Sequence, residues 1–401
     1  MERNDPRYQA YVEILKEELI PAMGCTEPIA LAYAAAKARE VLGVLPDSVQ
    51  LQVSGSIIKN VKSVIVPNTG HLKGMEAAVA AGIIAGSAEK ELEVISEVSE
   101  EKKSAIRDYL QTVPITIEHT EQGHVFDIVV TERCGQDYAR VRIADYHTNI
   151  CRIEKNGTVL YEVPLLDETV QEDARADRSL LNMQDIWDFA ETADLRDVAD
   201  LLERQIRYNN AIAEEGLLGD YGANIGRVLL TTYGNDVSNR AKAKAAAGSD
   251  ARMNGCELPV IINSGSGNQG ITCSVPLIEY AKELHSGKEK LYRALIISNL
   301  VAIHEKTGIG TLSAYCGAVS AGAGAGAGIV YLCGDGYQAA IHTVVNALAI
   351  VSGIVCDGAK ASCAAKIASS VDAALLGYNM YKCNQEFKGG DGIVMKDIET
   401  T

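Results

Sequence analysis

An uncharged stretch near the C-terminal end most constrains the fold. No Asp, Glu, Lys or Arg lies between Lys306 and Asp335, and the next charged residue after Asp335 is Asp357. A run of this length reaches the size of a transmembrane helix. It consists mainly of Gly, Ala and Ser, however, so its transfer into lipid would gain little free energy. We therefore expect two helices buried in protein, over about 310–331 and 336–354, whose small residues let neighbouring backbones approach closely.

The rest of the chain predicts an α+β fold in two parts. Residues 7–20 have apolar positions at helical spacing, whereas 113–163 alternate with period two and contain an Asn-Gly hairpin turn. The alternating region predicts a small antiparallel sheet of about four strands. Helical periodicity then returns and continues to the end of the sequence. We expect an α+β domain over residues 1–170 and an all-α domain over 171–401, with buried Gly/Ala-rich central helices.

Charge and cysteine usage limit the partners and the compartment. The net charge of −16 argues against nucleic acid and anionic membranes as partners. The first twenty residues contain no apolar core of the signal-peptide type, which predicts a cytoplasmic protein with reduced thiols. The ten cysteines then predict metal binding, catalysis or simple burial instead of a disulfide framework. The apolar, Ala-rich helices are compatible with a homodimer.

Cys25 lies just before a predicted helix. Thr26 is a candidate N-cap, Pro28 suits the first turn, and Glu27 is favourable beside the positive helix end. A helix N-terminus can lower the pKa of a thiol toward neutrality, so Cys25 is a candidate reactive residue. The alternative, a small buried apolar residue, stays open.

A Gly-rich polar loop follows a short apolar run later in the chain. Its sequence is NSGSGNQG, residues 263–270, and it leads into a helix. Backbone N–H groups of such a loop can hold a carboxylate or a phosphate. An ordinary connecting loop is the equally simple alternative.

Four cysteines occur in or beside the uncharged stretch. Cys316, Cys356 and Cys363 are flanked by small residues, which leave room for a group that is not a side chain, and an iron–sulfur cluster is such a group. Their spacing is that of neither a zinc site nor a ferredoxin, so spacing alone leaves metal binding as one alternative. Cys333 and Cys383 lack this context and are interpreted as core or surface thiols.

Four segments together carry a resemblance to known proteins. They are GCTEP, NSGSGNQGI, AYCGAVSAGAGAGAGI and GIVCDGAKASCAAK. With them, nearly the whole chain resembles L-cysteine desulfidases, and its helical C-terminal part resembles the α domain of bacterial iron–sulfur L-serine dehydratases. The resemblance implies a [4Fe–4S] cluster held by Cys316, Cys356 and Cys363. It also implies that Cys25 is either the proton acceptor or a fourth cluster ligand.

The same resemblance implies a β-elimination lyase. An iron without a protein ligand would act as a Lewis acid, and Cys25 would take the α-proton of an amino acid. Sulfide or water would leave, and the product would hydrolyse to pyruvate and ammonia. Ser264, Ser266 and Asn268 are candidates for binding the substrate carboxylate. We expect the site between the two parts of the protein, because Cys25 must reach the cluster.

Two departures from the dehydratases leave the substrate open among cysteine, serine and other β-substituted amino acids. Their last two cluster ligands are further apart than Cys356 and Cys363, and their Ser- and His-containing substrate loop is not recognisable. Two other function classes also stay open. One is a pyridoxal-phosphate lyase, with Lys59 or Lys306 as the Schiff-base residue. The other is a helical scaffold or metal-storage protein without catalysis.

Overall fold

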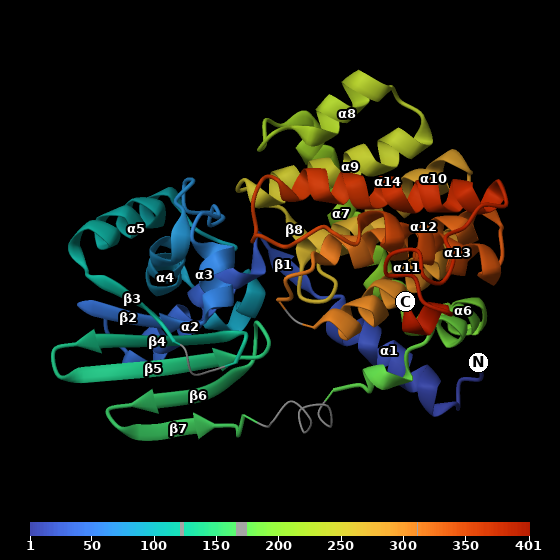
Figure 1. Ribbon diagram of the computed structural model, residues 1–401. Helices are drawn as coiled ribbons and strands as arrows, with labels where there is room; N and C mark the ends of the chain where they lie inside the picture. The colour runs from blue at the N-terminus through green and yellow to red at the C-terminus, as the bar shows by residue number, and fades with distance from the viewer. Residues whose placement is uncertain (121–123, 166–174, 311) are drawn as a thin grey trace.

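The computed structural model describes residues 1–120, 124–165, 175–310 and 312–401. A sheet part and a helical part lie side by side, which confirms the predicted α+β fold (Figure 1). The predicted domain boundary at residue 170 falls outside the described residues. Helix α1, Pro6–Glu18, precedes the sheet in sequence but packs on the helical part, where the ring of Tyr11 lies 5.3 Å from that of Phe189.

The sheet part is a six-stranded sheet with four helices beside it. The strand order is β3-β2-β4-β5-β6-β7, and all neighbours are antiparallel except β2 and β3, which are parallel. The alternation predicted about four strands, but the structure has five in that region and adds β2 from an earlier segment. The strands are β2 (Ser48–Val53), β3 (Ile115–His119), β4 (Asp127–Cys134), β5 (Asp137–Ala144), β6 (Ile150–Lys155) and β7 (Thr158–Glu162), and the helices are α2 (Thr26–Leu42), α3 (Gly55–Val61), α4 (Gly74–Ala85) and α5 (Glu100–Thr112).

The helical part is built around α12, Gly317–Cys333, which packs against α10, α11, α13 and α14. Helices α12 and α13 confirm the two central helices expected from the uncharged stretch. Among the described residues, no helix is both long enough and apolar enough to cross a membrane. The other helices are α6 (Met183–Thr192), α7 (Ala199–Leu218), α8 (Ile225–Tyr233), α9 (Val237–Met253), α10 (Gly267–Glu283), α11 (Lys288–Ile309), α13 (Tyr337–Val351) and α14 (Cys363–Lys382).

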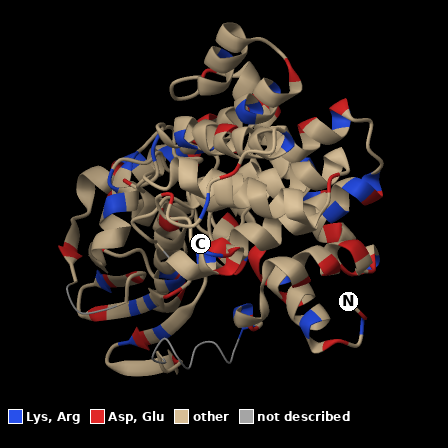
Figure 2. Cartoon of the chain, turned by 45° about the vertical axis from the view of Figure 1, so that its right-hand side comes forward, with Lys and Arg blue, Asp and Glu red and all other residues tan. Residues whose placement is uncertain are grey.

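Glycines of α12 allow its neighbours to approach closely on several sides. A Cβ on Gly324 would lie 2.4 Å from the carbonyl oxygen of Ser298 in α11, and a Cβ on Gly322 would lie 2.7 Å from the Cβ of Ser370 in α14. Figure 2 shows that the helices at the centre of the helical part are largely free of charged residues. The Gly-Ala run therefore serves close helix packing.

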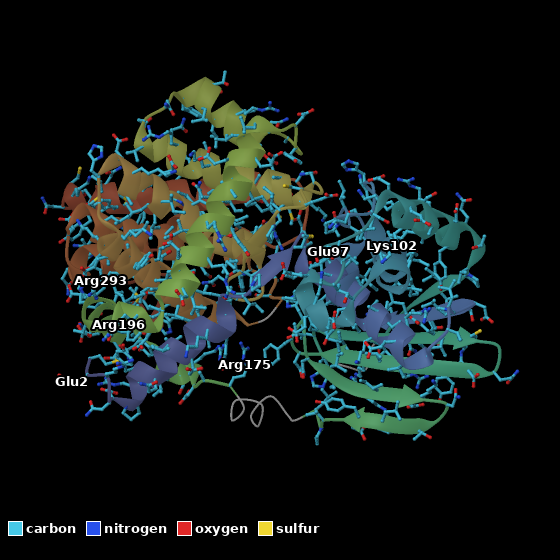
Figure 3. All side chains as sticks on the ribbon, turned by 180° about the vertical axis from the view of Figure 1, so that it is seen from behind. Glu2, Glu97, Lys102, Arg175, Arg196 and Arg293 are labelled. Carbon is cyan, nitrogen blue, oxygen red and sulfur yellow. The ribbon has the colours of Figure 1, made fainter. Side chains whose placement is uncertain are left out.

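Several contacts hold the parts together. Strand β1, Pro21–Met23, pairs antiparallel with β8, Pro259–Ile261, and so ties the GCTEP segment to the Gly-rich loop. Arg175 makes another connection and lies between the parts (Figure 3). Its guanidinium is paired with Glu17 and Glu18 at the end of α1, at 3.2 and 3.1 Å, and it lies 4.4 Å from the ring of Tyr146 in the β5–β6 connection.

Candidate functional site

The N-terminal ends of four helices from different parts of the chain lie around one site. The hydroxyl of Thr26, at the start of α2, donates a 2.9 Å hydrogen bond to the carbonyl of Gly265, just before α10. Gln269, in the first turn of α10, packs so closely on Gly317, at the start of α12, that a Cβ there would lie 2.5 Å away. The thiols of Cys316 and Cys363, at the starts of α12 and α14, interact electrostatically. Helix N-termini carry partial positive charge, so this site favours anionic groups.

Cys25 itself caps α2, and Thr26 is the first helical residue, so the predicted N-cap at Thr26 is wrong. The Cys25 side chain is buried and makes no cap hydrogen bond. Its thiol instead donates to Oε2 of Glu27 at 2.9 Å, while Nδ2 of Asn60 in α3 donates to Oε1 of the same carboxylate at 2.9 Å. Glu27 is therefore held as an acceptor between two elements.

The pKa of the Cys25 thiol is raised well above its ordinary value, first by burial and second by the negative charge of Glu27. The expected lowering of this pKa by the helix N-terminus is therefore wrong, because desolvation of a fully buried thiolate outweighs the helix dipole. Burial also acts to raise the pKa of Glu27, but His147, the hydrogen bond from Cys25 and Arg252 act oppositely, and the net pKa is lowered. The resting pair is a thiol beside a carboxylate.

Arg252 was not among the predicted residues. It lies at the end of α9, its side chain is 3% exposed, and its Nη1 donates to Oδ1 of Asn268 at 3.1 Å. Burial lowers the pKa of Arg252, while Cys25, Glu27 and Cys363 act to raise it, so the guanidinium lies within electrostatic reach of all three. A charged residue inside the small-residue run AAAGSDARMNGC is the one local signal that could have found it.

His147 was also missed. It lies in the β5–β6 connection, and a Cβ on Gly265 would lie 3.0 Å from its Cε1. The residue as a whole is partly exposed, whereas its Nε2 is buried without a hydrogen-bond partner. No local sequence signal marks it or Asn60, because both reach the site from the sheet part.

Backbone pairing brings Cys316 and Cys356 side by side. The N–H of Cys316 donates to the carbonyl of Ile354 at 3.1 Å, and the N–H of Cys356 donates to the carbonyl of Ala314 at 2.7 Å. Cys363 opens α14, and its thiol lies 3.7 Å from the carbonyl of its own loop at Gly358. Burial raises the pKa of Cys316 and of Cys363, and the nearby Cys356 acts in the same direction on both.

The loop from Cys356 to Cys363 packs on α3. Gly358 has φ +99°, and a Cβ there would lie 2.4 Å from the carbonyl oxygen of Lys59, so glycine is required at this position. The ammonium group of Lys59 in turn donates to the carbonyl of Cys356 at 3.5 Å. The ammonium group of Lys366 is paired with the carboxylate of Asp357 at 2.5 Å. The cysteine loop thus contacts the same helix that supplies Asn60 to Glu27.

The three cysteines suit a cluster in their chemistry. All ten cysteines are free. Across the described ranges, no three His, Cys, Asp or Glu side chains are grouped so that they could hold one metal ion. An iron–sulfur cluster is bound differently, because separate thiolates bind its separate irons. Cys316, Cys356 and Cys363 offer free thiols that influence one another electrostatically, which is compatible with that way of binding.

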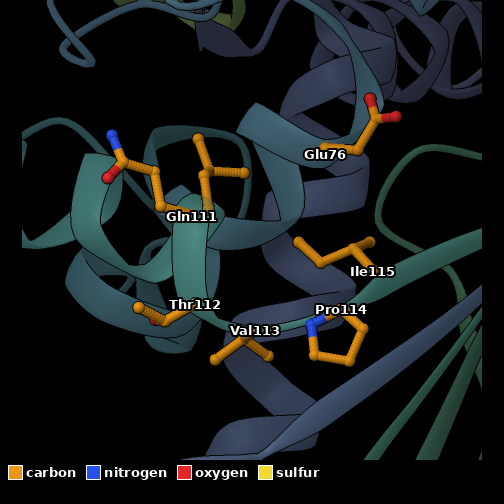
Figure 4. A pocket seen from close by; sticks show the side chains of 7 residues that line it. Glu76, Gln111, Thr112, Val113, Pro114 and Ile115 are labelled. Carbon is orange, nitrogen blue, oxygen red and sulfur yellow. The ribbon is translucent and has the colours of Figure 1, made fainter.

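The three predicted carboxylate-binding residues have different contacts. The hydroxyl of Ser264 donates to Oδ1 of Asn263 at 2.9 Å, and Ser266 caps α10 without a side-chain hydrogen bond. Asn268 accepts from Arg252. A cavity at the turn from α5 to β3 is shown in Figure 4, and its lining, Glu76 and residues 110–115, includes no residue of this site.

A family model described as "Serine dehydratase alpha chain" matches residues 89–401, more than three quarters of the chain. The chain belongs to the serine dehydratase alpha-chain family. The resemblance drawn from the sequence motifs is thereby confirmed. Membership indicates a lyase-type enzyme similar to the iron–sulfur serine dehydratases.

Curated relatives match this member of the serine dehydratase alpha-chain family along nearly its full length. The UPF0597 protein of Desulfitobacterium hafniense is 62% identical over 401 residues, covering 100% of this chain and 93% of the relative. The UPF0597 protein of Lachnoclostridium phytofermentans is 53% identical, covering 98% and 94%. That of Treponema denticola is 47% identical, covering 100% and 94%. The match to the Desulfitobacterium hafniense protein includes Cys25, which precedes the residues covered by the family model.

Proposed function

We propose that the protein is an iron–sulfur-dependent lyase that converts L-cysteine to pyruvate, ammonia and sulfide. The observation that carries the proposal is the position of Arg252, within electrostatic reach of Cys25, Glu27 and Cys363. It connects the buried candidate proton acceptor with Cys363, a half-buried candidate cluster ligand.

Cys316, Cys356 and Cys363 would hold a [4Fe–4S] cluster. When bound through three thiolates, it supplies one iron without a protein ligand, a Lewis acid for the β-leaving group. The three thiols are free, and Cys316 and Cys363 lie at the starts of two helices, which supports this assignment. Within the described residues, the strand that leads into the Gly-rich loop, β8, belongs to a two-stranded sheet with β1. The loop therefore lacks the doubly wound sheet that the pyridoxal-phosphate alternative requires.

The chain's own residues would handle the proton. At rest the proton lies on Cys25, hydrogen-bonded to Glu27. A positive group beside the thiol favours the thiolate, and the ammonium group of a bound amino acid is such a group. Glu27 then accepts the thiol proton, and the Cys25 thiolate takes the α-proton. The α C–H bond breaks and its electron pair forms a C=C bond, while the β C–S bond breaks and its electron pair leaves with the sulfur as hydrosulfide. The aminoacrylate released becomes an imine that water hydrolyses to pyruvate and ammonia.

L-serine would undergo the same elimination with water as the leaving group. The Ser- and His-containing substrate loop of the dehydratases is not recognisable here, and the last two candidate cluster ligands are closer together than theirs. Both departures support a substrate other than L-serine. The predicted homodimer and the cytoplasmic location remain predictions.

The test is anaerobic purification with iron and acid-labile sulfide analysis, followed by pyruvate assays on L-cysteine and L-serine. We expect about four iron and about four sulfide per chain, and faster pyruvate formation from L-cysteine. Cys356→Ser should lose iron, whereas Cys383→Ser, an exposed thiol outside the site, should keep it. No iron after reconstitution, or an absorption band that borohydride removes, would refute the proposal and favour pyridoxal phosphate.

A further inference from the structure

Several buried polar atoms around Glu27 and the start of α10 have no hydrogen-bond partner. They are Oδ1 of Asn60, Nε of Arg252 and Oε1 of Gln269, on residues that are 5%, 3% and 6% exposed, together with Nε2 of His147. An unsatisfied buried polar group costs free energy, so native proteins rarely keep one without a ligand or water to pair with it. Four such atoms from four elements that meet at Glu27 and the start of α10 indicate a polar ligand.

Arg252 is the cation of this set. It donates to the neutral amide of Asn268 and forms no ion pair among the residues that the structure describes. The contrasting case is Arg142, whose guanidinium donates to both carboxylate oxygens of Asp127, at 2.9 and 2.7 Å. A buried guanidinium without a carboxylate partner is suited to bind one from a ligand, because its fork matches carboxylate geometry.

The start of α10 adds donors beside Arg252. Ser266 caps this 17-residue helix without a side-chain hydrogen bond, so the first N–H groups have no side-chain acceptor from the cap. Gly267 packs directly on the guanidinium: a Cβ there would lie 2.3 Å from Nε of Arg252. The charged group and the helix end therefore lie together.

We propose that Arg252, with the N-terminus of α10, binds the α-carboxylate of the substrate, and that the amide oxygens of Asn60 and Gln269 accept from its ammonium group. The inference rests on the proposed function in one respect, that the ligand is an α-amino acid. It makes Arg252 the residue that distinguishes amino acids from amines and amides. It also places the ammonium group near the Cys25–Glu27 pair, since Asn60 contacts Glu27.

Binding of an unreactive amino acid tests this without turnover. L-alanine lacks a β-leaving group, and L-alaninamide lacks only the carboxylate charge. We expect calorimetry on the anaerobically reconstituted full-length protein to give roughly 10-fold or more tighter binding of L-alanine. Arg252→Gln should abolish this preference. Arg39→Gln is the matched control: its Nε is also buried without a partner, but it lies about 20 Å along α2 from Cys25.

A second variant keeps the charge of Arg252 but shifts its position. Gly267→Ala should also weaken the preference for L-alanine, because its Cβ would displace the guanidinium. Equal binding of the two ligands by the wild type, or a wild-type preference in either folded variant, would overturn the proposal. Failure of the proposed function looks different. In that case no amino acid yields pyruvate, yet the preference for L-alanine over L-alaninamide persists and still depends on Arg252.

Discussion

The thiol of Cys25 donates a 2.9 Å hydrogen bond to Oε2 of Glu27, and both side chains are buried. The contact places the negative charge of Glu27, which raises the pKa of the thiol, beside the candidate acid–base residue Cys25. Burial and Glu27 together keep Cys25 protonated in the resting site, so the environment of the thiol, and not only its identity, governs the proposed chemistry.

Glu27→Gln should therefore change the pH dependence of turnover. Glu27 contributes to the raised pKa of Cys25, so removing its charge lowers that pKa. Glu27 is also the proposed acceptor of the thiol proton, so Glu27→Gln must start from a thiolate already present in the free enzyme. We expect its kcat/KM at neutral pH to fall below that of the wild type and to rise with pH through the lowered pKa of Cys25. Steady-state pyruvate assays between pH 6 and 10 measure both; a pH profile in Glu27→Gln that matches the wild type would show that Glu27 does not handle this proton.

Cys25→Ser separates the two roles implied for this residue. As a base it should be needed for turnover but not for the cluster, so kcat should fall by about 10²- to 10⁴-fold with unchanged iron content. Cys333→Ser, an exposed thiol at the other end of α12, is the control and should leave both unchanged. Loss of iron in Cys25→Ser would identify Cys25 as a fourth ligand.

Gly324→Ala tests the close packing of α12. Alanine favours a helix over glycine, yet its Cβ would lie 2.4 Å from the carbonyl oxygen of Ser298. We expect the overpacking to dominate and the free energy of unfolding to fall by about 1–3 kcal/mol. Gly308→Ala, in α11 with nothing within 4 Å, should instead raise stability by up to about 1 kcal/mol. Urea unfolding of both variants measures these changes in free energy. A stabilised Gly324→Ala variant would show that the space beside α12 can accommodate an extra methyl group.

Glu132, in the sheet part, predicts a pH dependence of the protein's stability. Its side chain is 0% exposed, neither carboxylate oxygen has a partner, and burial raises its pKa well above the ordinary value. Below the unfolded-state pKa the group is protonated in both states. Above it, the unfolded state ionises first, so the stability of the wild type falls as pH rises.

Glu132→Gln should remove that pH dependence. We expect it to stabilise the protein by about 1–3 kcal/mol at pH 8 and to change little at pH 4. The control is Glu118→Gln, an exposed residue of β3, which should stay within about 0.5 kcal/mol of the wild type. Denaturation at the two pH values measures both, and a wild-type pH slope in Glu132→Gln would contradict the prediction.

Much of the architecture follows from local patterns. A charge-free run of Gly and Ala can only be buried, which predicted α12 and α13, and the change of period predicted where the sheet lies. The segments around Cys25, Cys316, Cys356 and Cys363 carried the family resemblance, because such motifs are contiguous in sequence.

Tertiary structure decided the rest. Strand β2 joins the sheet beside β3 through a pairing between distant segments, which no local period reveals. Asn60, His147 and Arg252 reach Cys25 and Glu27 from separate elements, so only packing brings them together. The protonation of Cys25 was likewise decided by burial: a helix N-terminus is visible in sequence, whereas desolvation depends on everything that folds around the thiol.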